Sequence, residues 1–100
     1  MILHTVNRSP FGSNCLQSCL DIAASGSAII LIEDGVYAAL ANSDLSAQIL
    51  AAMDKHTFYV LGPDLLARGI QNSVLEQIES VDYSGFVTLC TQYDKVVSWY

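Results

Sequence analysis

The chain contains little positive charge. Its 100 residues include four Lys and Arg side chains against ten Asp and Glu, so the formal net charge is −6. The cations are scattered along the sequence, at Arg8, Lys55, Arg68 and Lys95. Because binding to a phosphate backbone or to an anionic membrane surface depends on clustered cations, the sequence argues against direct contact with nucleic acid or a membrane.

Charges of both signs are scarce as well. Charged residues make up 14% of the chain, well below the usual quarter, whereas 52% of the residues are hydrophobic. A chain of this length is expected to form a single domain, here residues 1–100, with a core of its own. A domain this small with so few charges is expected to hide part of its surface against partner subunits.

Several signatures of location and chemistry are missing. The first six residues lack the basic region and cleavage site of a signal peptide, and no apolar run approaches the length of a membrane span. The three cysteines form no CxxC pair, which favours a reduced, cytoplasmic protein. No zinc-ligand spacing, Walker motif or GxGxxG pattern is present, so we expect no metal and no cofactor.

The most informative pattern is an apolar run that ends in acids. Residues 29–32 are uninterrupted aliphatic side chains, and Glu33, Asp34 and Gly35 follow directly. In a strand with one solvent-exposed face, apolar and polar residues would alternate. This uninterrupted run therefore predicts a strand buried on both faces in a parallel sheet. Ligands of such sheets bind at the carboxyl ends of the strands, where Glu33 and Asp34 would lie.

Strand and helix patterns alternate along the rest of the chain. This order predicts an α/β fold, with three α/β/α layers and a mostly parallel five-stranded sheet. Strands are expected near 2–6, 28–32, 57–61, 80–82 and 95–99. Helices are expected near 14–24, 36–41, 43–53, 64–67, 72–77 and 83–92, with a turn at 62–64.

Four ordered segments together resemble the DsrH/TusB family, and the resemblance covers nearly the whole chain. They are Leu3 to Phe11 (LHTVNRSPF), Ile32 to Ala39 (IEDGVYAA), Tyr59 to Gly69 (YVLGPDLLARG) and Val81 to Val87 (VDYSGFV), followed by a C-terminal Trp99.

The resemblance implies a role in sulfur relay. Family members are small α/β subunits of cytoplasmic hetero-hexamers, DsrEFH or TusBCD, that pass persulfide sulfur to a carrier protein, DsrC or TusE. The implied partners are therefore DsrE/TusD-like and DsrF/TusC-like subunits and that carrier. The sulfur ends in wobble-position 2-thiouridine of tRNA in the Tus branch and serves sulfur oxidation in the Dsr branch.

Cys19 is the candidate catalytic residue. It matches a first-helix cysteine of DsrH-type sequences that TusB-type sequences generally lack, and a relay thiolate must be reachable by donor and acceptor. Its spacing from Leu16 and Ala23 equally suits a small hydrophobic residue in a core. Cys15 lies one turn earlier, at a separation that disfavours a disulfide with Cys19, and Cys90 has the spacing of a packing residue.

The sulfur-carrying position of the sister subunit is not matched by a cysteine here. In DsrE or TusD that cysteine follows the third strand, about seven residues before an Arg-Gly pair. Counting back from Arg68 and Gly69 reaches Leu61, with Gly62 beside it. The resemblance therefore implies that the main relay site of the complex is on another chain.

Two histidines and two acids have competing interpretations. His4, inside the first strand, is expected to be a hydrogen-bonded core residue, and His56 is expected to be exposed. Glu33 and Asp34 could act as an acid pair, but helix capping or a subunit interface is favoured.

Aromatic residues are more numerous than a small core needs. Interfaces are enriched in Tyr and Trp, so Phe11, Tyr37, Trp99 and Tyr100 join Glu33 and Asp34 as interface candidates. Trp99 could equally complete the core.

Three functions remain open from the sequence. The chain could be an accessory subunit of a sulfur-relay complex, a sulfurtransferase that carries persulfide on Cys19, or a stand-alone domain that binds a small ligand at the strand ends.

Overall fold

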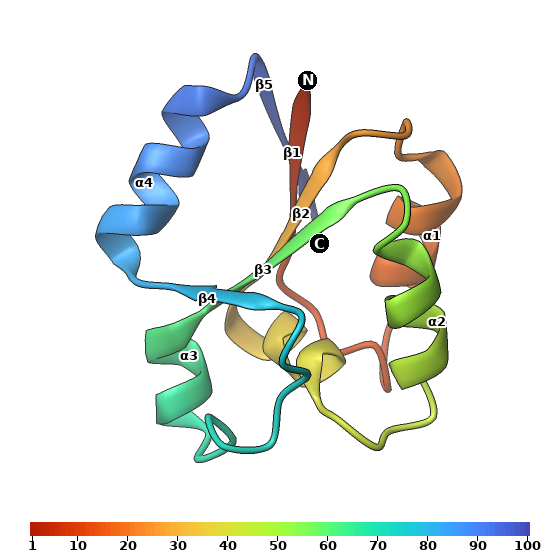
Figure 1. Ribbon diagram of the computed structural model, residues 1–100, viewed down its shortest axis with the longest axis vertical. Coiled ribbons are helices and arrows are strands. Elements are labelled where there is room, and N and C mark those ends of the chain that lie inside the picture. The colour runs from red at the N-terminus through yellow and green to blue at the C-terminus, as the bar shows by residue number, and fades with distance from the viewer.

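The fold is built on one parallel sheet. The structure, a computed structural model, describes residues 1–100. Its strands are β1 (Ile2–Val6), β2 (Ala28–Leu31), β3 (Thr57–Leu61), β4 (Glu79–Val81) and β5 (Lys95–Trp99). They lie in the order β4-β3-β2-β1-β5, and every pairing is parallel (Figure 1). The predicted five-stranded α/β fold is confirmed.

The helices cover both faces of the sheet and the carboxyl ends of its strands. They are α1 (Cys15–Ile22), the 3-10 helix η1 (Glu33–Ala39), α2 (Ser46–Ala52), α3 (Gly62–Ala67) and α4 (Tyr83–Gln92). None of them is long and apolar enough to cross a membrane.

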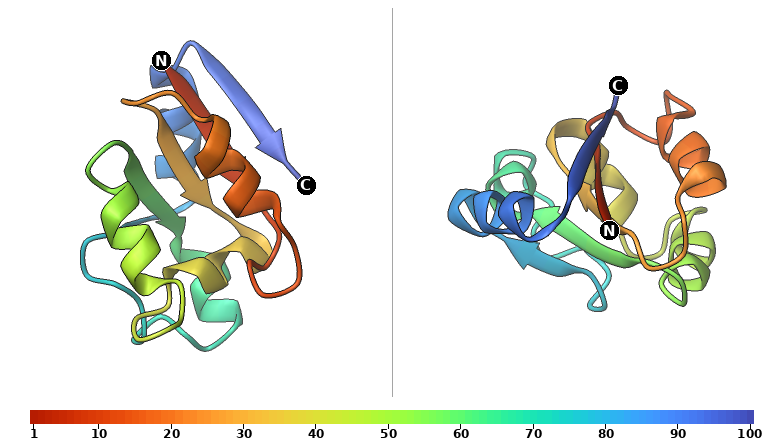
Figure 2. Two further views of the ribbon diagram at one scale, coloured as in Figure 1. Left: turned by 90° about the vertical axis from the view of Figure 1, so that its right-hand side faces the viewer. Right: turned by 90° about the horizontal axis from the view of Figure 1, so that it is seen from above.

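The direction of each crossover decides which face a helix covers. The connections from β1 to β2 and from β2 to β3 move one way across the sheet, and they place α1 and α2 on one face. The connection from β4 to β5 moves the other way. Because crossovers between parallel strands are right-handed, α4 lies on the opposite face, as the view from above shows (Figure 2).

The two faces carry cores of unequal size. The core beneath α1 and α2 contains fourteen buried residues, whereas the core beneath α4 contains four: Leu3, Ala28, Ile30 and Leu89. Alternate residues of β2 enter the two cores, and all four are fully buried. The prediction of a central strand buried on both faces is therefore confirmed.

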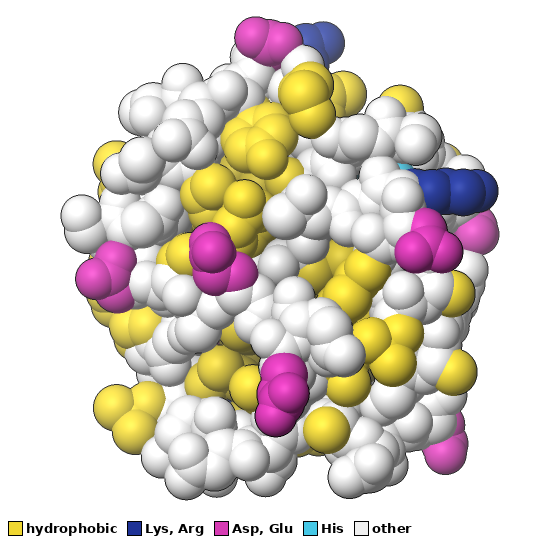
Figure 3. Space-filling model, viewed as in Figure 1, with side chains coloured by type: hydrophobic (Ala, Val, Ile, Leu, Met, Phe, Trp, Pro, Cys, Tyr) yellow, Lys and Arg dark blue, Asp and Glu magenta, His cyan; other side chains and the backbone are white.

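The α4 face leaves apolar surface uncovered. Tyr83 and Val87 on α4 are 61% and 63% exposed, and Val96 on β5 is 44% exposed. Figure 3 shows hydrophobic side chains gathered in a band beside α4 and over the sheet. A single helix is too narrow to cover this face.

The sequence patterns misplaced several helix starts. The expected turn at 62–64 is the first turn of α3, where Pro63 is tolerated because the first helical N–H groups have no partner. Helix η1 begins at Glu33, ahead of the expected position, and α2 begins at Ser46, after it.

The predicted helix at 72–77 is wrong. Val74 pairs with Leu40 in an isolated antiparallel bridge, and the Leu75 N–H donates to the Ala39 carbonyl at 2.8 Å. The backbone groups of residues 74–75 are therefore bonded to the end of η1, and not to one another in a helical turn.

Gly35 provides a test of how closely η1 approaches β1. A Cβ at this position would lie far inside van der Waals contact with the Val6 carbonyl oxygen and 2.9 Å from the Val6 carbonyl carbon. We expect Gly35→Ala to lower the free energy of unfolding by about 2–3 kcal/mol, since rigid backbone must move. Chemical denaturation measures the change.

The matched control is Gly12→Ala, where an added Cβ meets nothing within 4 Å. An equal loss of stability in both variants would contradict the proposed close approach.

Candidate functional site

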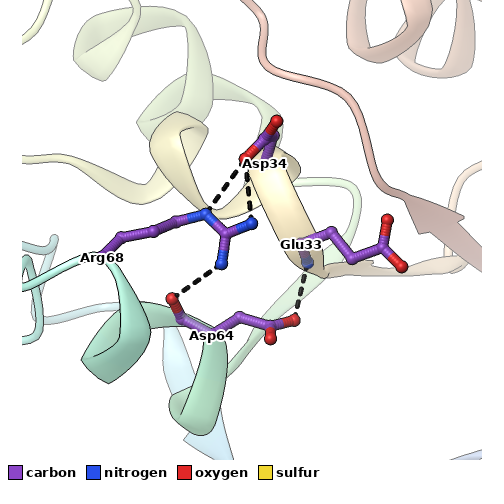
Figure 4. Close-up of polar contacts among 4 residues, drawn as sticks. All are labelled: Glu33, Asp34, Asp64 and Arg68. Atoms are coloured by element: carbon purple, nitrogen blue, oxygen red, sulfur yellow. Dashed lines mark hydrogen bonds and ion pairs between the residues drawn. The ribbon is translucent and has the colours of Figure 1, made fainter.

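Four polar residues lie together at the carboxyl ends of the strands. Glu33 and Asp34 begin η1 just after β2; Asp64 lies in α3, which follows β3, and Arg68 caps the C-terminus of that helix. Parallel strands place these two segments at one edge of the sheet, as the sequence predicted for the acids. Figure 4 shows the resulting cluster.

Arg68 ties the two segments together. Its Nε and Nη2 donate to Asp34 Oδ1 at 3.0 and 2.9 Å, and its Nη1 donates to the Asp64 carbonyl at 3.2 Å. The hydrogen bonds to Asp34 raise the pKa of Arg68 above its usual range. Asp34 therefore already has a cationic partner, which leaves Glu33 as the free acid of the predicted pair.

Glu33 has a left-handed backbone. Its φ is +49°, a conformation that residues other than glycine rarely adopt. The Asp64 carboxylate accepts a hydrogen bond from the Glu33 N–H at 2.7 Å and supports this conformation. The Glu33 side chain points away from Arg68 (Figure 4).

A polar cavity of about 380 Å³ lies beside Glu33. It is lined without a single hydrophobic residue, by Asn7, Arg8, Ser9, Gly12, Ser13, Glu33 and Asp34. Such a surface can hydrogen-bond a polar group but offers an organic cofactor no apolar wall. No group of three or more His, Cys, Asp or Glu side chains is placed to hold a metal ion.

The candidate thiol of Cys19 lies inside the larger core. The residue is 0% exposed, and this burial raises the pKa of its thiol to about 12. Cys15 and Cys90 are free and half-buried, and Cys90 packs against the smaller core. In this position Cys19 acts as a small hydrophobic residue, and no thiol of the chain lies in the polar cavity.

Leu61, with Gly62 beside it, is the position that the resemblance matched to the sister subunit's cysteine. Leu61 is 3% exposed, and a Cβ on Gly62 would meet Ser80 Oγ of β4 at 2.8 Å. A side chain fits here only if Ser80 moves.

The two histidines are both buried. His4 is 4% exposed, and its Nδ1 accepts a hydrogen bond from Trp99 Nε1 at 3.0 Å, so the core interpretation is confirmed. The expectation for His56 is wrong: it is 7% exposed, and its backbone N–H donates to the carbonyl of Ala52, the last residue of α2, at 3.0 Å. Sequence reasoning missed the His4–Trp99 pair, since 95 residues separate its members.

The aromatic interface candidates differ in how exposed they are in the structure. Phe11 and Tyr100 are exposed, at 58% and 79%, while Tyr37 and Trp99 are half-buried. Trp99 packs against the larger core, so the alternative that it completes the core describes its position in this chain.

Comparison with known proteins identifies the family. The family described as "DsrH like protein" matches residues 8–96. The chain belongs to the DsrH-like family. Protein TusB of Pectobacterium parmentieri is 35% identical, and protein TusB of Shigella flexneri is 32% identical, each over 98 residues. Each alignment covers 98% of this chain and the whole relative, which confirms the DsrH/TusB resemblance.

Solved structures confirm the fold at lower sequence identity. The ychN protein of E. coli superposes with a TM-score of 0.83 at 19% identity, over 98% of this chain and 97% of that one. MTH1491 of Methanobacterium thermoautotrophicum, a protein of unknown function, gives a TM-score of 0.70 at 14% identity, over 97% and 96% of the two chains.

Thiol alkylation tests the position of Cys19 in this DsrH-like chain. At pH 7 a thiol with a pKa of about 12 is ionised in roughly one molecule in 10⁵, and burial blocks reagent as well. In the folded chain we expect Cys15 and Cys90 to be alkylated first, and Cys19 at least about a hundredfold more slowly. Peptide mass spectrometry gives the three rates.

The control is the same labelling in denaturant, where the three thiols should react at similar rates. Alkylation of Cys19 in the folded chain as fast as Cys15 would contradict its assignment to the core.

Proposed function

We propose that this DsrH-like chain is an accessory subunit of a cytoplasmic sulfur-relay complex. The support for the relay itself is the family membership, which spans nearly the whole chain. The proposed partners are DsrE/TusD-like and DsrF/TusC-like subunits in a hetero-hexamer, with a DsrC/TusE-like protein as the sulfur carrier.

The accessory role rests on one observation, the burial of Cys19. In persulfide transfer an acceptor thiolate attacks the outer sulfur of a donor persulfide, the sulfur–sulfur bond breaks, and the donor leaves as a thiolate. For this step the acceptor thiol must be ionised, the donor persulfide must be reachable, and the donor sulfur must leave readily as a thiolate. The Cys19 thiol is enclosed in the core, and burial raises its pKa to about 12, so it stays protonated at neutral pH. Leu61 and Gly62 stand at the position matched to the sister subunit's cysteine and neither has a thiol, so sulfur would be held by a sister chain.

The chain would contribute surface to the assembly. The band of exposed apolar side chains at α4 has the composition of an interface core, and it includes Tyr83, Val87 and Val96. Phe11 and Tyr100 add exposed aromatic groups near the loop after β1 and at the C-terminus. Glu33 could bind a partner's N–H groups across the polar cavity.

The destination of the sulfur is proposed as tRNA wobble 2-thiouridine, because the curated relatives at 31–35% identity carry the name TusB. The scarcity of Lys and Arg supports a role without direct tRNA contact, which other proteins of the pathway would make.

Co-purification followed by persulfide detection tests the proposed function. The tagged chain should isolate two homologous sister chains, and incubation of the complex with a sulfur donor should add the mass of one sulfur atom to a sister chain. Cys19→Ser should leave transfer to the carrier within about twofold of the original rate, since Cys19 does not ionise.

Two outcomes would replace the proposal. A one-sulfur mass gain on this chain that disappears in Cys19→Ser would establish it as a sulfurtransferase. A monomer that isolates no sister chain would favour the stand-alone domain that binds a ligand in the polar cavity.

A charge placed on α4 tests the assembly surface. Val87→Asp puts a carboxylate on a side chain that is 63% exposed, so the monomer should keep its stability. Burying that charge at a subunit interface should weaken assembly at least about tenfold, measured by sedimentation of the complex.

The matched control is Ile22→Asp on α1, the helix that covers the opposite face, where the side chain is 69% exposed. Equal weakening by both substitutions, or by neither, would remove α4 from the proposed interface.

A further inference from the structure

The end of the C-terminal strand is held by one partly buried side-chain hydrogen bond. Trp99, the last residue of β5, donates from Nε1 to Nδ1 of His4 in β1 at 3.0 Å. The two rings lie 6.2 Å apart between centroids and are inclined by 41°. Residue 99 pairs with Val6 in the β1–β5 ladder, so the indole reaches back along the neighbouring strand β1 by two residues to His4.

This hydrogen bond requires a neutral imidazole. The indole N–H is a donor only, so Nδ1 must present its lone pair and the imidazole proton must sit on Nε2. The Nε2 atom is itself buried without a partner. A second proton on His4 would place an N–H on Nδ1 directly opposite the indole N–H, and two donors would then face each other in a buried site.

The surroundings of His4 provide nothing that would stabilise its charge. Burial lowers the pKa of His4 below its usual value of 6.5, and the nearby His56 lowers it further. β2 has no titratable side chain. The remaining titratable groups on the elements packed against His4 contribute no shift to it: Cys15, Cys19 and Asp21 on α1 and Lys95 on β5.

We propose that the His4–Trp99 contact is a proton-sensitive latch, and that protonation of His4 releases the indole and the last residues of β5 from the larger core.

The position of β5 limits the release to one end of the strand. β5 lies at the edge of the sheet and pairs with β1 alone. At its start, the ammonium group of Met1 forms an ion pair with Asp94, and the Asp94 N–H donates to the Met1 carbonyl. Only Trp99 anchors the other end by its side chain, and Tyr100 beyond it is 79% exposed. Opening would therefore expose the Trp99 indole beside Tyr100, which is already exposed.

The direction of the pH dependence follows from the lowered pKa of His4. The unfolded chain takes up this proton at higher pH than the folded chain does. The stabilising contribution of neutral His4 is therefore complete above about pH 7.5, declines as the pH falls through 6.5, and is lost below the folded pKa.

The single tryptophan of the chain makes the latch observable. Its indole N–H gives one cross-peak in a nitrogen–proton NMR spectrum, and its emission reports exposure. In the full-length chain, lowering the pH from about 8 to about 5 should move that cross-peak and shift the emission to longer wavelength, with a midpoint below 6.5.

Two variants separate the latch from general acid unfolding. His4→Asn places a non-titrating carbonyl oxygen where Nδ1 lies, so the indole signal should remain unchanged across the same pH range. Trp99→Phe removes the donor, and the His4 imidazole should then titrate at higher pH than in the original chain.

The second histidine needs its own control. His56→Gln removes the repulsive charge near His4, so the indole transition should persist with a midpoint moved to higher pH. The latch is refuted by a transition that survives in His4→Asn, by its loss in His56→Gln, or by an indole signal in the original chain that does not change with pH.

Discussion

The complete burial of β2 is the constraint on which the rest of the structure depends. A strand buried on both faces needs a paired strand along each of its two edges and a layer of helices against each face of the sheet. Right-handed crossovers then place α1 and α2 on one face and α4 on the other. The same parallel arrangement brings the ends of β2 and β3 together, where Arg68 joins Asp34 to the backbone of Asp64.

The unequal sizes of the cores on the two faces of the sheet relate the fold to the proposed function. The α1/α2 face encloses the larger core and, with it, the Cys19 thiol, so the face with the most buried volume removes the candidate nucleophile from solvent. The α4 face has the smaller core and an apolar border that remains exposed. A subunit of this kind is suited to contact with other chains. The polar cavity beside Glu33 lies at the edge of the sheet, apart from both cores.

Local patterns predicted the elements whose own residues determine them. The bounds expected for β1, β3, α4 and β5 match the structure, since each has a clear apolar or β-branched pattern with a turn or a cap beside it. Asp82, for example, caps α4 by accepting from the Gly85 N–H at 2.7 Å. The segment 62–82 was predicted least well. Its backbone finds partners at the end of η1, and no local pattern describes a contact such as that of Leu40 with Val74, which are 34 residues apart.

The sequence by itself determined the α/β class, the buried central strand, the family and the gathering of acids after β2, because periodicity and ordered motifs are local properties of the chain. Only the tertiary structure decided the state of individual side chains. Burial raises the pKa of Cys19, His56 is buried rather than exposed, and the pairing of β5 with β1 brings Trp99 onto His4 from 95 residues away. The desolvation and hydrogen bonding of a side chain depend on which distant segments pack against it, and that is set only when the sheet is assembled.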